Sequence, residues 1–189
     1  YNDENFNLDI FYHVPRYHWG YKGDLFGLVQ ETTDMTGLNG QDIWNAKAPF
    51  GFEFSGKKAL DGLTILAGPE VYWGANPKVI AQYRFGDKKQ YSIMHSQDVA
   101  RATEADGSDT TNRKSTQTTI QGEFNFNRDT KLQIGAIVSG RDRIGEDYNY
   151  VKNSQTIANE EVEFKDTLGL KAKIEHALNS NSKLYFAGQ

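Results

Sequence analysis

The chain has 189 residues, of which 38% are apolar and 13% aromatic, and it contains 18 glycines, four prolines and no cysteine. This length can form one domain with its own core, and many aromatics and glycines with few prolines favour strands and turns over helices. The absence of cysteine excludes disulfides and thiolate metal sites, and a net charge of −4 gives no general attraction to nucleic acid or anionic lipid.

Three strands are predicted in the N-terminal part of the chain. Residues 6–14 alternate between apolar and polar side chains, and Pro15 ends the pattern. A second strand is predicted near residues 24–31. Residues 50–54, with a phenylalanine at every second position, predict a third. Residues 32–48 carry turn chemistry instead.

Residues 60–85 have the clearest pattern, two strands around a turn at residues 74–77. One face of this predicted hairpin is apolar, and the other carries five candidate solute-binding residues: Glu70, Tyr72, Lys78, Gln82 and Arg84. We expect these five side chains to lie along one hydrated path. Because the patch mixes both charges with one aromatic ring, it suits a neutral, hydroxyl-rich solute.

The remaining sequence continues the alternation in short segments. Strands are predicted near residues 90–96, 119–126, 131–138 and 168–175, and a last one from residue 183. The polar segments 97–117 and 141–161 are predicted to be solvated loops. The fold class is therefore all-β, an antiparallel up-and-down meander of about ten strands in one domain spanning residues 1–189.

The predicted connections differ in length between the two ends of this meander. Successive connections alternate between the ends, and the first, third and later odd-numbered ones are all short. The even-numbered connections are long, with residues 74–77 as the exception. One trimmed end and one loop-rich end are typical of outer-membrane barrels.

A sheet with one apolar and one polar face has two physical solutions. The apolar face packs on a second sheet in a soluble sandwich, or it faces lipid in a closed barrel with a wet interior. Charges in the middle of predicted strands, including the further lumen candidates Lys171, Lys173 and Glu175, suit a water-filled lumen. No apolar run approaches the roughly 20 residues of a membrane helix.

In these features the chain resembles bacterial outer-membrane β-barrel proteins, particularly porin-like and polysaccharide-export-like barrels. The resemblance rests on the alternating segments, the turns at 127–129 and 179–182, and the GPEVYWGANP hairpin at 68–77. It implies a channel or anchoring pore for hydrophilic solutes, saccharides among them, in the outer membrane of a Gram-negative bacterium. The implied partners are the lipid bilayer and an oligomer or larger assembly.

One departure from this family lies at the end of the chain. Such barrels usually finish with an aromatic residue, whereas this sequence ends Ala187-Gly188-Gln189 and begins without Met. We therefore expect a mature or partial chain of a larger barrel.

Catalytic and metal-binding patterns carry little signal. No nucleophile elbow, P-loop or dinucleotide glycine motif occurs, and no spacing pairs carboxylates for glycoside hydrolysis, so neither an enzyme nor a cofactor is predicted. Glu104, Asp106 and Asp109 could offer oxygen ligands to calcium, but they lack the twelve-residue loop pattern and we expect a solvated loop. The four scattered histidines, His13, His18, His95 and His176, predict no metal site.

Two other functional classes stay open at this point. One is a secreted soluble β-sandwich that binds carbohydrate through exposed aromatic residues, and the other is a structural subunit of a surface assembly. Dependence on detergent discriminates between them and a barrel, because a lipid-facing surface aggregates in water.

Overall fold

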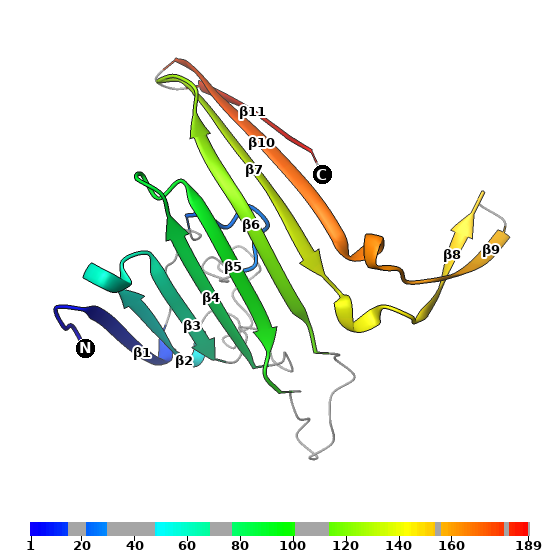
Figure 1. Ribbon diagram of the computed structural model, residues 1–189, viewed down its shortest axis with the longest axis horizontal. Coiled ribbons are helices and arrows are strands. Elements are labelled where there is room, and N and C mark those ends of the chain that lie inside the picture. The colour runs from blue at the N-terminus through cyan, green and yellow to red at the C-terminus, as the bar shows by residue number, and fades with distance from the viewer. Residues whose placement is uncertain are drawn as a thin grey trace.

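The computed structural model describes residues 1–14, 22–29, 48–68, 77–100, 114–153, 156–179 and 182–188. These residues form a nine-stranded sheet and a separate two-stranded sheet (Figure 1). All neighbouring strands are antiparallel, and their order in the large sheet follows the sequence, with β10 next to β7. The predicted all-β, up-and-down meander is therefore confirmed.

The elements of the two sheets have these bounds. The large sheet contains β1 (Phe6–Val14), β2 (Ala48–Gly56), β3 (Leu63–Gly68), β4 (Lys78–Phe85), β5 (Tyr91–Asp98), β6 (Thr116–Asn125), β7 (Thr130–Ser139), β10 (Leu168–Asn179) and β11 (Ser182–Gly188). The small sheet pairs β8 (Asp147–Lys152) with β9 (Thr156–Glu161). Three short 3-10 helices, η2 (Lys58–Leu60), η3 (Arg141–Arg143) and η4 (Phe164–Thr167), lie in the connections.

The strand predicted near residues 24–31 is wrong over the described residues 22–29, which form turns. Gly23 and Gly27 both have positive φ values, 84° and 71°, which interrupt an extended chain. The Asp24 carboxylate also accepts hydrogen bonds from the backbone N–H groups of Leu28 and Val29, each at 2.9 Å. These local bonds stabilise a turn, and they outweigh the short apolar alternation of the segment.

The solvated loop predicted at residues 141–161 is also wrong, because this stretch contains the β8–β9 hairpin, which projects away from the large sheet (Figure 1). Cross-strand side chains hold it together. The Tyr150 hydroxyl donates to Glu160 at 2.6 Å, and the Asn159 amide donates to Asn149 at 3.1 Å. Polar cross-strand pairs of this kind stabilise a hairpin with little apolar burial.

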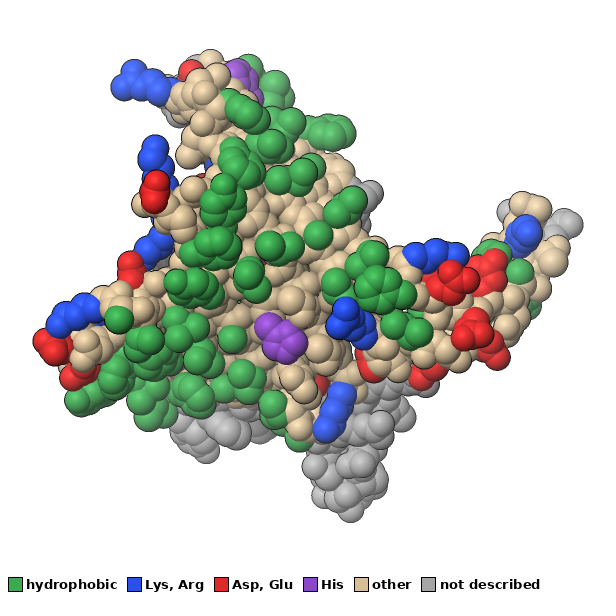
Figure 2. Space-filling model, in the orientation of Figure 1, with side chains coloured by type: hydrophobic (Ala, Val, Ile, Leu, Met, Phe, Trp, Pro, Cys, Tyr) green, Lys and Arg blue, Asp and Glu red, His purple; other side chains and the backbone are tan. Residues whose placement is uncertain are grey.

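One face of the large sheet is apolar and remains exposed. Strand pairing aligns Leu63, Tyr83, Ile93, Ile120, Ala136 and Leu170 in one row across six strands. Figure 2 shows hydrophobic side chains gathered over this face. Large side chains on it that are exposed include Ile10, Phe52, Tyr83, Tyr91, Ile93, Ile120, Phe124, Ile134, Leu168, Leu170, Ile174, Leu184 and Phe186. The described part of the chain places no second sheet over them.

The opposite face is polar and better buried. Its buried side chains include Gln82, Ser92, Ser96, Asp98, Thr119 and Gln121, with Ile80 and Met94 among them. Residues 22–29 lie on this side and pass behind β5 and β6 in Figure 1. Side chains and the segment of residues 22–29 therefore pack against the polar face of the sheet, whereas little of the described chain packs against the apolar face.

The connections divide into a short-turn end and a long-connection end. Residues 57–62, 86–90, 126–129 and 180–181 join strands at the first end, and residues 15–47, 69–77, 99–115 and 140–167 join them at the second. Loss of the predicted strand merges two connections into residues 15–47, so the asymmetry persists. Among the described strands, β1 pairs only with β2 and β11 only with β10, which leaves two open edges.

Candidate solute-binding face

The predicted site residues are spread over the polar face. Lys78, Gln82 and Arg84 lie on β4, and Lys171, Lys173 and Glu175 lie on β10. Glu70 and Tyr72 fall outside the described residues. The calcium candidates Glu104, Asp106 and Asp109 also fall outside them.

Gln82 anchors the segment of residues 22–29 to the sheet. Its side chain is 4% exposed, and its amide donates to the Lys22 carbonyl at 2.9 Å and to the Ser92 hydroxyl at 3.2 Å. A second contact runs from the Leu25 backbone N–H to the Gln121 side-chain oxygen at 2.5 Å. Leu25 itself is buried. Gln82 is therefore a buried structural contact, where the sequence predicted a residue along an open path.

Lys78 lies at the opposite end of β4 from Arg84. The two are six positions apart along an extended strand, which corresponds to about 20 Å. The Lys78 ammonium is 3.8 Å from the buried Asp98 carboxylate, which also accepts from the Ser115 backbone N–H and hydroxyl at 2.8 and 3.0 Å. Lys78 and Arg84 therefore share the polar face of β4 but lie at its two ends.

Two charged residues of β10, Lys173 and Glu175, belong to a ladder of polar side chains across β6, β7 and β10. The Lys173 ammonium is 2.5 Å from Glu175, and the neighbouring Lys131 ammonium is 2.8 Å from Glu123. Gln133 also donates to Glu123 at 3.1 Å. The four charged side chains of these two ion pairs are about one-third exposed, and their charges balance. Lys171, two residues before Lys173 on the same strand face, gives this hydrated part of the polar face an excess of one positive charge.

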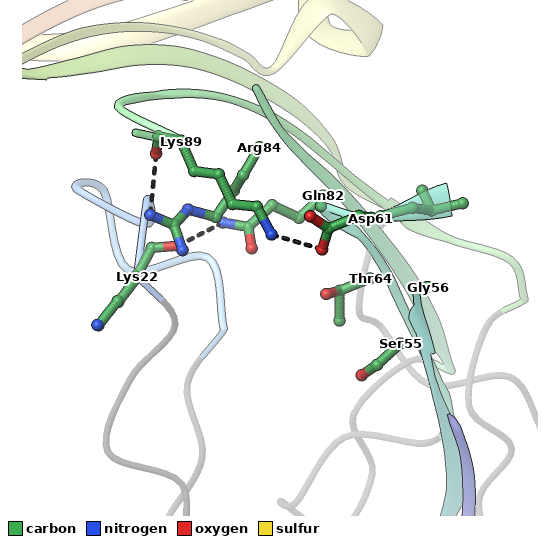
Figure 3. A pocket seen from close by; sticks show the side chains of 10 residues that line it. Lys22, Ser55, Gly56, Asp61, Thr64, Gln82, Arg84 and Lys89 are labelled. Atoms are coloured by element: carbon green, nitrogen blue, oxygen red, sulfur yellow. Dashed lines mark hydrogen bonds and ion pairs between the residues drawn. The ribbon is translucent and has the colours of Figure 1, made fainter. Parts of the chain in front are cut away.

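A recess of about 270 Å³ opens on the polar side near the short-turn end (Figure 3). Its lining residues come from residue 22, β2, the β2–β3 connection, β3, β4 and the turn after β4. They are Lys22, Ser55, Gly56, Asp61, Gly62, Leu63, Thr64, Gln82, Arg84 and Lys89. The recess therefore brings together two of the predicted site residues, Gln82 and Arg84.

Fixed polar contacts arrange one wall of this recess. Arg84 donates from Nη2 to the Lys89 backbone carbonyl at 2.9 Å, and the Lys89 ammonium is 2.5 Å from the Asp61 carboxylate. The Arg84 Nε is shielded from solvent and has no hydrogen-bond partner. Sequence reasoning missed Lys22, Asp61 and Lys89, because each lies in a turn and meets Arg84 only in the folded sheet.

His95 and His176 each contact a threonine hydroxyl, and His95 Nε2 also lies 3.5 Å from the Gln97 side-chain oxygen. The His95 ring nitrogen Nδ1 lies 2.9 Å from the Thr118 hydroxyl, and His176 Nδ1 lies 2.9 Å from the Thr130 hydroxyl. The side chains of His13 and His18 lie outside the described residues. Among the described residues, no group of three or more histidine, aspartate or glutamate side chains could hold a metal ion. No helix in this part of the chain is long and apolar enough to cross a membrane.

Comparison with protein-family models, curated proteins and solved structures found no significant match to this chain. The functional argument therefore rests on the chemistry of the two faces and of the recess.

Proposed function

We propose that this chain forms the wall of a bacterial outer-membrane β-barrel that conducts hydrophilic solutes. The observation that carries the proposal is the burial of the two faces of the sheet. Large apolar side chains are exposed on one face, and polar side chains are buried on the other. Soluble monomers rarely expose apolar patches beyond a few hundred Å². Contact with lipid removes the free-energy cost of exposing apolar side chains to water, because hydrocarbon solvates such side chains without interdigitated packing.

Aromatic rings near the short-turn end support the same environment. Tyr83, Phe85, Tyr91 and Phe124 follow one another across β4, β5 and β6, with ring centroids separated by 5.9, 5.4 and 6.1 Å. Phe85 ends β4 and Tyr91 begins β5, so this band lies where the strands turn. Barrel proteins carry such aromatic girdles at the membrane–water interface.

The connections and the edges complete the proposal. Short turns at one end correspond to the periplasmic side of an outer-membrane barrel, and the long connections correspond to the external side. Because an exposed strand edge is unsatisfied in lipid, the open edges of β1 and β11 make this sheet one part of the barrel wall, which further strands complete.

The polar face then lines the solute path. The paired charges of Glu123, Lys131, Lys173 and Glu175 keep this wall hydrated, and Lys171 adds one cation on the same face. Residues 22–29 fold against the same face and occupy part of the interior. Saccharides and other small hydrophilic molecules are the solutes that such a lining suits.

A pair of arginine substitutions on adjacent residues tests the lipid-facing assignment. Ile134 is 49% exposed on the apolar face, and Ile134→Arg should cost about 2–4 kcal/mol if it lies near the bilayer midplane. Gln133 points to the polar face beside Glu123, so Gln133→Arg is the matched control and should change stability little. Folding titrations into lipid vesicles measure both.

Two results would contradict the proposal. The first is a native protein that stays folded and monomeric in water without detergent. The second is an Ile134→Arg variant that folds into vesicles as well as Gln133→Arg, as expected if the apolar face is covered by another copy in a water-soluble surface assembly.

A further inference from the structure

We propose that the recess beside Arg84 binds the carboxylate of an acidic sugar, such as a uronic acid, which deepens and rests on the proposed conduit function. The sequence alone favoured a neutral solute, because it grouped Arg84 with Glu70, Tyr72 and Lys78. The folded chain instead surrounds Arg84 with Lys22, Asp61 and Lys89. This changes the charge of the site.

The recess carries an excess of positive charge. Arg84 and Lys89 contribute two cations, and Asp61 contributes one carboxylate, which is already paired with Lys89. Lys22 turns its backbone carbonyl toward Gln82, and its side chain points away from the other labelled residues (Figure 3). The ion pair between Asp61 and Lys89 leaves Arg84 without a carboxylate partner on the recess wall. An anionic group is therefore favoured over a neutral one at this position.

Arg84 has hydrogen-bonding capacity that the protein does not use. A guanidinium presents five N–H donors, and the contact to the Lys89 carbonyl uses one of them. Nε is shielded from solvent and has no acceptor, so a ligand in the recess would use the donors of the two Nη atoms. A carboxylate can accept two parallel hydrogen bonds from a guanidinium, which matches donor geometry as well as charge.

The remaining lining residues suit the hydroxyl groups of a sugar. Ser55 on β2 and Thr64 on β3 are direct neighbours in the sheet, and both contribute hydroxyl-bearing side chains to the recess lining (Figure 3). The volume of about 270 Å³ lies just below the range of about 300–1,000 Å³ of sites that hold drug-sized ligands. One sugar ring with its carboxylate is therefore the appropriate size of ligand.

The test compares methyl glucuronide with methyl glucoside, which differ in the carboxylate, by NMR titration of the detergent-folded protein. The native protein should bind the glucuronide at least tenfold more tightly. Arg84→Gln should abolish this preference, and Asp61→Asn should strengthen glucuronide binding several-fold, because it removes the competing carboxylate. Lys88→Gln is the control, since Lys88 is exposed on the same turn and does not line the recess.

Asp61 is more than half exposed, so Asp61→Asn should leave the fold intact. This variant therefore tests the proposal even if Arg84→Gln misfolds. Equal affinity for the two sugars, or no change in either variant, overturns the carboxylate site. A native protein that conducts in planar bilayers but ignores glucuronide refutes this inference alone. A protein that binds glucuronide but never conducts refutes the conduit and leaves the site intact.

Discussion

Replacement of Gly23 by alanine tests how residues 22–29 are held against the polar face. A Cβ at Gly23 would lie 2.8 Å from the Ser92 Cβ and 2.9 Å from its Oγ. Carbon atoms normally approach no closer than about 3.5 Å. Ser92 is buried in β5, which is paired on both sides, so the strand cannot move away. The segment of residues 22–29 must shift instead.

The expected cost has two parts. Backbone strain at φ 84° costs a non-glycine residue about 1–2 kcal/mol. The steric overlap adds about 1–3 kcal/mol, as overpacking does in a close-packed interior. A shift of the segment also lengthens the bonds from Gln82 to the Lys22 carbonyl and from Leu25 to Gln121, each with a net contribution of about 0.5–1.5 kcal/mol. The strain and the overlap together cost about 2–5 kcal/mol, and the weakened bonds add to this loss.

Gly27 provides a matched control within the same segment. Its φ is 71°, but an added Cβ would meet nothing within 4 Å. Gly27→Ala should therefore carry the backbone strain of about 1–2 kcal/mol without the overlap. Ser92→Gly in the Gly23→Ala background removes the two closest atoms, so it should recover part of the loss as a coupling energy.

Denaturant titration of the folded protein measures the free energies of unfolding of these variants. Hydrogen exchange at the Leu25 amide reports the docking directly, because this N–H is bonded to Gln121. Gly23→Ala should accelerate exchange at Leu25, and Gly27→Ala should not. Equal losses of stability in the two alanine variants, with Leu25 equally protected in both, would show that residues 22–29 are not seated against Ser92.

Two further predictions concern the connections. If the long connections are external, trypsin added to whole cells should cut after Lys152 in the exposed β8–β9 hairpin but not after Arg128 in the exposed short turn. Cleavage at both sites in intact cells would contradict the assigned orientation. In the same hairpin, the hydrogen bond from the Tyr150 hydroxyl to Glu160 raises the pKa of that phenol above its ordinary value of 10.0. Glu160→Gln should return the Tyr150 pKa towards that value, as followed by tyrosinate absorbance with Tyr150→Phe subtracted. Because the folded-state pKa is raised, this contact stabilises the hairpin below pH 10 and is lost as the pH rises through the folded pKa; an unchanged titration in Glu160→Gln would refute the contact.

The polar face of the sheet also changes the interpretation of individual substitutions. A surface residue of a soluble sheet usually tolerates a change of polarity, but Gln82 is a polar residue with two buried contacts. Loss of its amide leaves the Lys22 carbonyl without this donor. Polar residues on this face therefore divide into those that hold the segment 22–29 and those, such as Lys131 and Glu123, that are hydrated.

The sequence by itself determined the nine strands of the large sheet and their two faces, although it also predicted a strand near residues 24–31 that does not form over the described residues 22–29. Alternation is a property of an extended chain, since successive side chains point to opposite sides, and residues such as Leu132, Ile134 and Ala136 need no distant partner to reveal it. Because alternation shows where each strand begins and ends, the difference in connection length between the two ends of the sheet could also be predicted. The β8–β9 hairpin was missed because its stability comes from specific polar pairs across two strands and not from an apolar face.

Only the tertiary structure decided how the recess is built. Lys22 and Gln82 are separated by 60 residues in sequence, and Asp61 and Lys89 by 28, so no local pattern links them. Their meeting depends on a turn that docks residues 22–29 on β4 and on the register of three neighbouring strands. Period and composition describe the surface that each strand presents, whereas the convergence of charges depends on which strands pair and on what packs against them.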